Sequence, residues 1–447
     1  MSLIKFSTSN ENISSNGGFS FISGILDSLL PMNRWDSDLP CYHNVQFSHQ
    51  TIVRSVIAMM AAGCCNFADV EKLGCDSMFQ QLVGEDIPSQ ESLRQRLNML
   101  ANRPWRPIVD ASAAAILRKA ELEKIKIAGL ELIPIDIDVS VLEDTSSHKE
   151  GVAMSYHKVK GFAPIFCYAG KQGYMVANEL RPGSQHSENG AVAFLERCVN
   201  ILRAGGYAPK QLLLRVDSGH DSSDFIQKAK ELGVYYIIKR NPRKENDQQL
   251  LDSIRSYEEP ECPRIGKTIY RGFRSDKKPK GFESYNGYLA VEATVRTILA
   301  DGQYVLGAGE IEVDSYWTNL PCTVKECVQL YHDHGTSEQF HSELKSDLGI
   351  ELLPSGKMST NALVLGLASI AFNCLRFIGD AALPQKEKEP AKEKEHEPVR
   401  MRLRTVLLFF IKIGCKLVRH ANTIRLNVSR GFSYFATIKR IEASCCS

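Results

Sequence analysis

The sequence lacks the features that define several protein classes. Its 447 residues include thirteen cysteines, an odd number, and no Cys-x-x-Cys pair. This disfavours a secreted disulfide scaffold and a thiolate zinc module, and favours reduced, buried thiols in a cytoplasm. The longest apolar run, Ala362 to Phe372, is far shorter than the ~18–20 residues that span a bilayer, so no membrane partner is expected. The polar first twelve residues contain no signal-peptide apolar stretch, which again predicts a cytoplasmic protein.

The chain also has little net charge, only +2, but that charge is unevenly spread. From Val399 to the end there are ten Lys and Arg and one acidic residue, Glu442, which is a net charge of +9 and leaves residues 1–398 at −7. A second basic stretch runs from Arg264 to Lys280, with Tyr270 and Phe273 among its cations. Either patch alone is best explained as a solvated surface. Two patches on either side of a carboxylate cluster favour a polyanionic partner, because phosphates are bound by clustered Lys and Arg.

Apolar residues at helical spacing predict short helices between residues 48 and 101, including Thr51 to Ala62. Ser89 is the predicted N-cap of a further helix that carries Arg94 and Arg96. A helix pair of this kind is compatible with a helix-turn-helix DNA reader, although most such pairs only pack together.

The following region has the pattern of an α/β domain. Alternating or continuous apolar runs predict strands at Leu132–Leu142, Ala163–Tyr168, Tyr174–Leu180, Gln211–Asp217 and Val234–Ile238, with helices at Gly190–Leu202 and Asp224–Leu232. Three strands followed by helix, strand, helix and strand is a mixed α/β order.

The second half begins with an insertion, Asn241 to Pro321, with β-like runs such as Tyr288 to Val295. The patterns then predict one long helix, Thr323–Leu348, an apolar helix, Ser359–Ile378, a solvated linker, Pro384–Pro398, and a tail that begins as a helix and ends in strands at Thr423–Val428 and Phe432–Ile438. The predicted division is a disordered start (1–24), a helical region (25–128), an α/β core (129–240 and 322–382) around a β-rich insertion (241–321), a charged linker (383–398) and a basic C-terminal segment (399–447).

Two predicted strands carry carboxylates toward their ends. Asp138 is the last acid on the acidic face of one strand and Asp217 ends another, and strand ends of an α/β sheet meet at the rim where such folds place their sites. Hard oxygen ligands suit Mg²⁺, which binds through one or two carboxylates plus substrate phosphate. Strand-end Asp residues are often only turn caps, and the pattern leaves the choice between Asp136 and Asp138 open.

The predicted long helix supplies a third acid. At about 100° per residue, His334, Glu338 and Lys345 fall on the face of Tyr331, whereas Glu343 and Asp347 fall on the opposite side. Helical geometry therefore selects Glu338 as the inward acid. A mixed-charge helix face is more often a solvated surface, but the apolar helix that follows favours partial burial.

Tyr331, His334, Glu338 and Lys345, separated by two, three and six residues, resemble the Tyr-Arg-Glu-Lys signature of bacterial insertion-sequence transposases of the DDE class. Further stretches resemble the insertion sequence 1380 family within that class. They are Ile135–Ser140, Lys149–Gly151, Glu179–Ser187, Arg215–Gly219 and Gly335–Lys345.

The resemblance implies a ribonuclease-H-like catalytic core interrupted by a β-rich insertion before the last acid. It implies Asp138, Asp217 and Glu338 as catalytic and metal-binding acids for two Mg²⁺ ions, which Mn²⁺ is expected to replace. It implies Tyr331 and Lys345 as contacts to transposon-end phosphates, with His334 where the group usually has Arg. Histidine has an ordinary pKa of about 6.5, so this contact is expected to be weaker or pH-dependent.

The implied activity is metal-dependent cleavage of double-stranded DNA at terminal inverted repeats and joining to target DNA, by a homodimer on the bacterial nucleoid. The predicted DNA contacts of the mid-chain basic stretch are Arg271, Arg274, Lys277 and Lys278. The alternatives are a non-catalytic, transposase-derived DNA-binding protein or regulator and a host nuclease with the same core. A zinc site at His334 and His341 is disfavoured, and Trp317 is expected in the core rather than stacked on a displaced base.

Overall fold

The computed structural model describes residues 7–8, 10–40, 45–84, 86–145, 148–156, 158–282, 284–299, 301–305, 307, 309–384, 399–421 and 423–445. The predicted linker, 383–398, lies outside these residues except for its first two positions.

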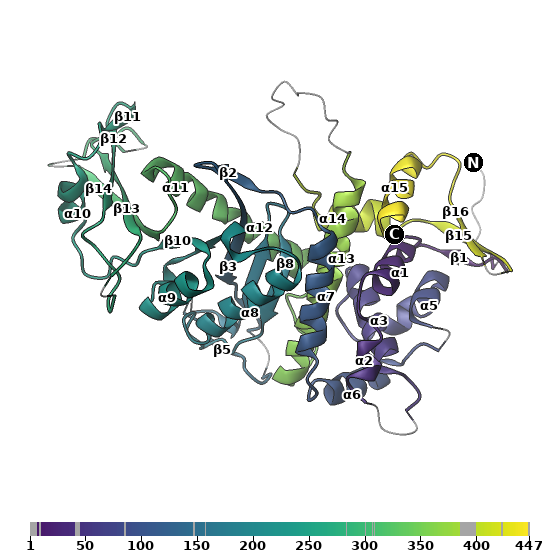
Figure 1. Ribbon diagram of the computed structural model, residues 1–447. Coiled ribbons are helices and arrows are strands. Elements are labelled where there is room, and N and C mark those ends of the chain that lie inside the picture. Colours follow the sequence, from purple (N-terminus) through teal and green to yellow (C-terminus); the bar gives the residue numbers. More distant parts are fainter. Residues whose placement is uncertain are drawn as a thin grey trace.

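The centre of the molecule is a mixed β-sheet (Figure 1). Its core strands follow the order β8-β7-β3-β9-β10. Their bounds are β3 (Leu130–Val139), β7 (Ile165–Ala169), β8 (Tyr174–Glu179), β9 (Leu212–Val216) and β10 (Tyr235–Lys239). β3 pairs antiparallel with β7 and parallel with β9, and β10 continues parallel to β9. This mixed α/β arrangement is consistent with the expected ribonuclease-H-like core.

Burial explains why these segments form strands. Every residue of β7 and β9 is buried, as expected for strands covered on both faces. The crossover helices are α8 (Ala191–Ala204) and α9 (Ser223–Leu232). The hydroxyl of Ser222 accepts a hydrogen bond from the backbone N–H of Phe225 and caps α9, while Gly233 ends it in the left-handed conformation.

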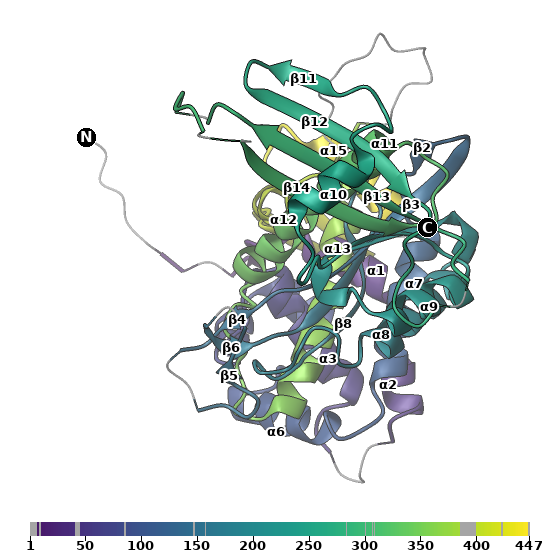
Figure 2. The same ribbon diagram turned by 90° about the vertical axis from the view of Figure 1, so that its left-hand side faces the viewer.

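The insertion continues the central sheet rather than forming a separate β unit. It contains α10 (Asp247–Ile254), β11 (Glu261–Arg264), β12 (Lys267–Arg274), β13 (Tyr288–Arg296) and β14 (Glu310–Thr318). β14 pairs antiparallel with β10, so the order β11-β12-β13-β14 extends the same sheet, which with β2 (Ile125–Ile127) reaches ten strands. Figure 2 shows these added strands together at one end of the molecule. A small second sheet is formed by β4 (Leu142–Glu143), β5 (Ala153–Met154) and β6 (Lys160–Phe162).

Helices of the N-terminal region surround one long helix, α13 (Met358–Ala382). They are α1 (Phe19–Ser28), α2 (Arg34–Ser37), α3 (His49–Ala61), α4 (Asp69–Leu73), α5 (Ser77–Val83), α6 (Gln90–Leu100) and α7 (Arg106–Lys119). β1 (Ile13–Ser14) and the first part of α1 lie within the segment predicted to be disordered, 1–24, so that prediction is wrong for residues 13–24. Phe19 and Ile22 of α1 are fully buried, and this packing orders the segment.

The helix α13 is longer than the longest apolar run in the sequence indicated. Its 25 residues are long and apolar enough to cross a membrane by length and composition, but 89% of its most apolar 18-residue stretch is buried within the protein. α13 packs against α3, α7 and β8. The amide side chain of Asn373 both donates to and accepts from the backbone of Met175, which covers the edge strand β8.

The C-terminal segment packs against the chain's beginning, as Figure 1 shows. It contains α14 (Leu403–Val406), a π turn (Leu407–Ile411), β15 (Cys415–His420), β16 (Thr423–Asn427) and α15 (Phe435–Cys445). β15 pairs with β1, and α15 packs against α1 and α13. The predicted strand Phe432–Ile438 is wrong throughout, because residues 432–434 lie in a turn and α15 begins at Phe435, with Ile441 and Cys445 buried on its inner side. One hydrophobic core runs from Phe19 to Cys445.

Candidate active site

Two neighbouring strands carry acids in register. β3 and β9 run parallel with Asp136 beside Arg215. Two residues further along each chain are Asp138 and Asp217. Adjacent strands lie about 4.8 Å apart. The sheet therefore brings together the two carboxylates that the sequence predicted at separate strand ends.

Asp136 and Asp138 share one face of β3 but differ in their surroundings. The Asp136 side chain is 3% exposed, and Arg215 donates to both of its oxygens, at 2.7 and 2.8 Å. His334 Nδ1 lies 3.0 Å from Asp136 Oδ1. Burial raises the pKa of Asp136, but the charges of Arg215 and His334 more than offset this and hold that pKa below its usual value. Asp136 is thus a paired core residue, and the geometry favours Asp138 as the first acid.

The carboxylate of Asp138 is oriented by a histidine. Its side chain is 24% exposed, and its Oδ2 lies 3.2 Å from His341 Nε2. The other ring nitrogen of His341 lies 3.3 Å from the hydroxyl of buried Tyr168. Burial raises the pKa of Asp138, whereas the hydrogen bond from His341 lowers it, and the net direction is downward. Asp138 is therefore held as a carboxylate with one side open to solvent.

Asp217 opens a tight turn after β9. Its Oδ1 accepts a hydrogen bond from the backbone N–H of Gly219 at 3.2 Å and lies 2.8 Å from Nδ1 of His220. The His220 side chain is fully buried, whereas that of Asp217 is 41% exposed. The turn thus fixes one carboxylate oxygen while the group remains accessible.

The helix predicted to carry the third acid is broken in two places. The structure has α11 (Val324–His332), a 3₁₀ turn (Asp333–Gly335), α12 (Thr336–Ser342) and a π turn (Glu343–Asp347) in place of one helix. The hydroxyl of Thr336 donates to the carbonyl of Asp333 at 2.9 Å, a side-chain bond that competes with regular helix. Gly335 also disfavours helix at this point.

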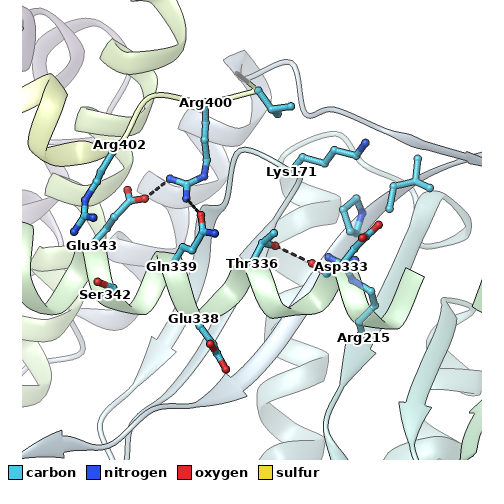
Figure 3. Close-up of a pocket in the computed structure, with 13 residues that line it drawn as sticks. Lys171, Arg215, Asp333, Thr336, Glu338, Gln339, Ser342, Glu343, Arg400 and Arg402 are labelled. Carbon is cyan, nitrogen blue, oxygen red and sulfur yellow. Dashed lines mark hydrogen bonds and ion pairs between the residues drawn. The ribbon is translucent and has the colours of Figure 1, made fainter. Parts of the chain in front are cut away.

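The four residues predicted to share one helix face nevertheless lie on the same side of this broken helix. Tyr331, His334, Glu338 and Lys345 line one cavity of about 920 Å³ with Asp138 and Asp217. Glu338 is exposed, and its side chain has no hydrogen-bond or ion-pair partner among the residues that the structure describes. Figure 3 shows its carboxylate extending away from Gln339 and Arg400. The structure thus gathers the three predicted acids around a single space.

Tyr331 and Lys345 border that space. The Tyr331 ring lies 4.7 Å from the ring of Tyr316, and burial together with Asp217 and Asp138 raises its pKa. Lys345 Nζ donates to the carbonyl of Val141 at 2.8 Å. Burial lowers the pKa of Lys345, although nearby carboxylates oppose this. Both side chains therefore lie close enough to carboxylates of the cavity for those charges to shift their pKa values.

His334 is placed differently from its predicted role. It is only 8% exposed and contacts Asp136 rather than projecting freely into the cavity. Burial lowers the pKa of His334, but Asp136 raises it more, and the net pKa lies above the ordinary 6.5. His334 is thus more fully protonated at neutral pH than the sequence suggested. Its positive charge is paired with Asp136 inside the protein.

Several lining residues carry no sequence signal. Tyr156, Lys239 and Asp314 come from three separate segments and meet only in the folded chain. Tyr156 is 63% exposed, and burial together with Asp217 and Asp138 raises its pKa. His341, which the sequence suggested only as an unfavoured zinc ligand, instead contacts Asp138.

The donor chemistry suits a hard divalent cation. The three acids offer only oxygen donors, and no cysteine lines the cavity. Within the described ranges, no three His, Cys, Asp or Glu side chains form a ready-made metal cage, so a cation in this cavity would need further ligands. Mg²⁺ commonly binds through one or two carboxylates completed by substrate phosphates. Asp138 and Asp217 fit that pattern as neighbours, with Glu338 across the cavity.

A family model described as Transposase DDE domain group 1 matches residues 2–444. The chain belongs to this DDE transposase family. Comparison with curated proteins gives no match. Seven chains of solved structures match. One is a piggyBac transposase in a synaptic complex with hairpin DNA, 11% identical with a TM-score of 0.42, in which 82% of this chain and 77% of that chain are covered. Membership of the DDE transposase family implies DNA transposition by a polynucleotidyl transferase.

The transposase neutralises much of its mid-chain basic stretch internally. Arg271 donates to Glu292 and to Glu261, each at 2.6 Å. Arg274 Nε donates to Asp276 at 2.7 Å. These arginines therefore do not form the free cationic surface that the sequence suggested, because strand pairing brings Glu292 beside Arg271 and Asp276 follows Arg274 by two residues.

The remaining predicted insertion contacts follow the same trend. Lys277 Nζ lies 3.3 Å from Glu245, and Lys277 and Lys278 line a cavity of about 520 Å³ beside Asp221 and Trp317. Residues 241–321 contain eleven Lys and Arg against thirteen Asp and Glu, so the insertion as a whole is slightly acidic.

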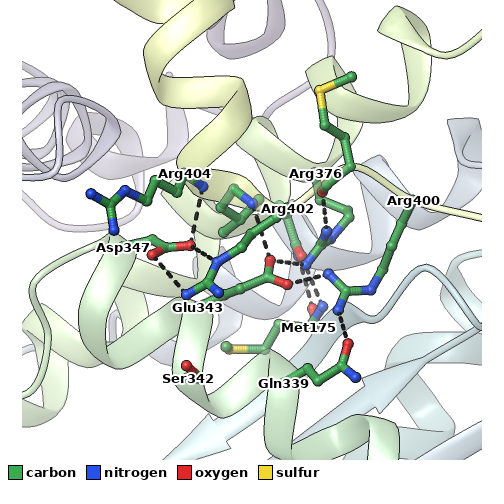
Figure 4. Close-up of polar contacts among 12 residues, drawn as sticks. Met175, Gln339, Ser342, Glu343, Asp347, Arg376, Arg400, Arg402 and Arg404 are labelled. Atoms are coloured by element: carbon green, nitrogen blue, oxygen red, sulfur yellow. Dashed lines mark hydrogen bonds and ion pairs between the residues drawn. The ribbon is translucent and has the colours of Figure 1, made fainter. Parts of the chain in front are cut away.

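The basic C-terminal segment contains both cations that pair with acids and exposed cations of another kind. Arg400 pairs with Glu343, and Arg402 Nε lies 3.1 Å from Asp347 (Figure 4). Four other cations are exposed and have no side-chain hydrogen-bond or ion-pair partner within the described part of the chain. They are Arg404, Lys412, Arg425 and Arg430.

Two secondary suggestions are also placed by the structure. Arg96 on α6 is 8% exposed and lies 3.2 Å from His49, so it packs inside the helical region. Arg94 is exposed and pairs with Glu91. Trp317 is 4% exposed and donates its indole N–H to Asp221 at 3.0 Å, which agrees with the expected core role.

Proposed function

We propose that this DDE transposase belongs to the insertion sequence 1380 family of bacterial mobile elements. It cuts DNA at the ends of its element and joins the freed 3′-hydroxyl to target DNA. One observation carries the proposal. Asp138 and Asp217 are in-register neighbours at the rim of the sheet, and unpaired Glu338 faces the same cavity.

The residues that line the cavity have different proposed roles. Asp138, Asp217 and Glu338 would hold two Mg²⁺ ions, or Mn²⁺ in their place, which when bound stabilise the attacking and leaving oxygens of phosphoryl transfer. His341 orients Asp138 through a 3.2 Å contact. Tyr331 and Lys345 border the cavity, where they can position DNA phosphates. Both cutting and joining are in-line transfers, in which positioning and charge neutralisation dominate.

The proposed partner is double-stranded DNA, both the terminal repeats and the target, bound by a homodimer in a bacterial cytoplasm. Support comes from the exposed, unpaired cations of the C-terminal segment, since phosphate binding requires charge that is not already neutralised. We assign the main backbone contacts to that segment rather than to Arg271 and Arg274, which are engaged by Glu and Asp.

The test is a nicking and gel-shift assay on DNA that carries the element's ends and flanking sequence. Asp217→Ala is expected to shift end-bearing DNA like the wild type and to give no Mg²⁺-dependent nicking. Asp252→Ala is the control, because Asp252 is an exposed acid on α10, remote in sequence and outside the cavity. Wild-type-level nicking by Asp217→Ala would refute the assignment.

The same assay separates the alternatives. Binding without nicking by the wild-type chain would indicate a non-catalytic regulator. Nicking without preference for the ends would indicate a host nuclease.

A further inference from the structure

The helical segment that presents Glu338 is held from its opposite side by the C-terminal segment. Glu343 and Asp347 are five and nine residues after Glu338. At about 100° per residue they lie about 140° and 180° around the helix from it. Their side chains are only 2% and 3% exposed. Buried carboxylates are costly unless paired and hydrogen-bonded, so their partners fix how this helix sits.

Glu343 is enclosed by two arginines from different parts of the chain. Arg376 of α13, whose side chain is fully buried, donates to Glu343 Oε2 at 2.7 Å. Arg400 pairs with the other oxygen, and the backbone N–H of Leu403 donates to Oε2 at 3.2 Å. Figure 4 shows these contacts converging on one carboxylate.

Arg400 also contacts the helix about one turn before Glu343. It donates to the side-chain carbonyl of Gln339 at 2.7 Å, and its guanidinium lies 4.9 Å from the ring centroid of Phe340. Phe340 in turn covers Gly173, which has a positive φ of 74° and where any Cβ would meet the ring at 2.3 Å. The helix is therefore fixed both to the β7–β8 turn and to the C-terminal segment.

A second arginine repeats the contact at the end of the π turn. Arg402 donates to both oxygens of Asp347, at 3.1 and 3.3 Å, and the backbone N–H of Arg404 donates to Oδ2 at 3.1 Å. The stretch 400–404 thus follows the helical segment 339–347 and contacts it at both ends. π turns are rare in proteins and occur often at functional sites.

We propose that residues 400–404 form a positioning clasp, in which Arg400 holds the helical segment 336–347 so that Glu338 faces Asp138 and Asp217. Arg400 is a positioning residue, since it touches Glu343 and Gln339 but none of the three acids. The catalytic consequence rests on the proposed function, whereas the structural consequence does not.

The test uses the full chain with Arg400→Ala and Arg400→Lys. Arg296→Ala is the matched control, because it breaks another Arg–Glu pair, to Glu312 at 2.7 Å, outside the cavity. Hydrogen exchange of peptides that cover 336–347 measures the clasp directly. The Mg²⁺ concentration for half-maximal nicking measures its effect on the site.

Arg400→Ala is expected to speed exchange within 336–347 and to raise the half-maximal Mg²⁺ concentration up to about tenfold, because loss of a group that contacts a metal ligand directly costs about tenfold to a hundredfold and Arg400 acts one contact further away. Arg400→Lys should recover part of this, because lysine keeps the charge but not the planar fork. Arg296→Ala should change neither quantity.

Wild-type exchange and wild-type Mg²⁺ dependence in Arg400→Ala would overturn the clasp. Weakened DNA binding with unchanged Mg²⁺ dependence would also overturn it, since Arg400 would then be a DNA contact. If Arg400→Ala fails to fold, Arg402→Ala decides in its place, because the Arg402 side chain is 53% exposed and its loss is milder. If the wild type does not nick DNA, the proposed function fails while exchange still tests the clasp.

Discussion

The two faces of the helical segment 336–347 place a carboxylate in opposite environments. Glu338 is exposed to the cavity and has no side-chain partner in the described structure, whereas Glu343 is buried and enclosed by Arg376 and Arg400. A carboxylate whose charge is already balanced by the protein has a structural role. One that is left unbalanced beside two other acids can attract a cation from outside.

β3 repeats this contrast over two residues. Asp136 is neutralised by Arg215 and His334, while Asp138 has His341 and the backbone N–H of Val139 beside it and remains partly open. Asp136 and Asp138 look equivalent in the sequence, and only their partners distinguish the structural acid from the candidate catalytic one.

The largest expected effect is that of Glu338→Gln on chemistry. Loss of one carboxylate of a metal site removes several kcal/mol of transition-state stabilisation, so the single-turnover nicking rate with Mg²⁺ should fall about a thousandfold. The unfolding midpoint should not change, because Glu338 has no partner to lose. A wild-type rate for Glu338→Gln would erase the distinction between the two faces.

Asp136→Asn is expected to act on stability instead. Removing one partner of a buried ion pair leaves the Arg215 charge unpaired and costs about 3–5 kcal/mol of unfolding free energy. Asp138→Asn, the matched variant two residues on, should cost clearly less, because its side chain is 24% exposed. Urea unfolding of both variants measures this. Equal losses would contradict the assignment of Asp136 to the core.

The smallest expected effect concerns pH. The folded pKa of His334 lies above 6.5, so its ion pair with Asp136 stabilises the fold fully below about pH 6.5, and this stabilisation is lost as the pH rises through the folded pKa. The difference in unfolding free energy between the wild type and His334→Gln should therefore shrink toward about pH 9. His420→Gln, at an exposed position on β15, should show no such trend. A difference that stays constant with pH would show that the ion pair does not contribute.

Local patterns were enough for much of the catalytic core. Continuous apolar residues predicted β9, a serine cap marked the start of α6, and helical spacing placed Tyr331, His334, Glu338 and Lys345 on one side of a helix. These features depend on neighbours in sequence, so they can be read without the fold. The break at Asp333–Gly335 was missed because the pattern on either side continues in phase.

Longer-range features could not be predicted in this way. Nothing in the sequence indicates that β14 joins β10, that Glu292 and Glu261 lie beside Arg271, or that the last helix packs on the first. The basic stretch therefore seemed a free surface until strand pairing brought acids to it.

The amino-acid sequence thus specified which acids this transposase has, their order, and the local elements that carry them. Only the tertiary structure decided which charged side chains are paired and which are not. Asp136 and Asp138, two residues apart on β3, have the same local sequence pattern, and helical spacing separates Glu338 from Glu343 without showing which carboxylate is paired. The members of each pair differ because segments more than thirty residues away supply arginines to one carboxylate and leave the other facing the cavity. Burial makes that pairing obligatory for Asp136 and Glu343, and solvent access removes the need for it at Asp138 and Glu338.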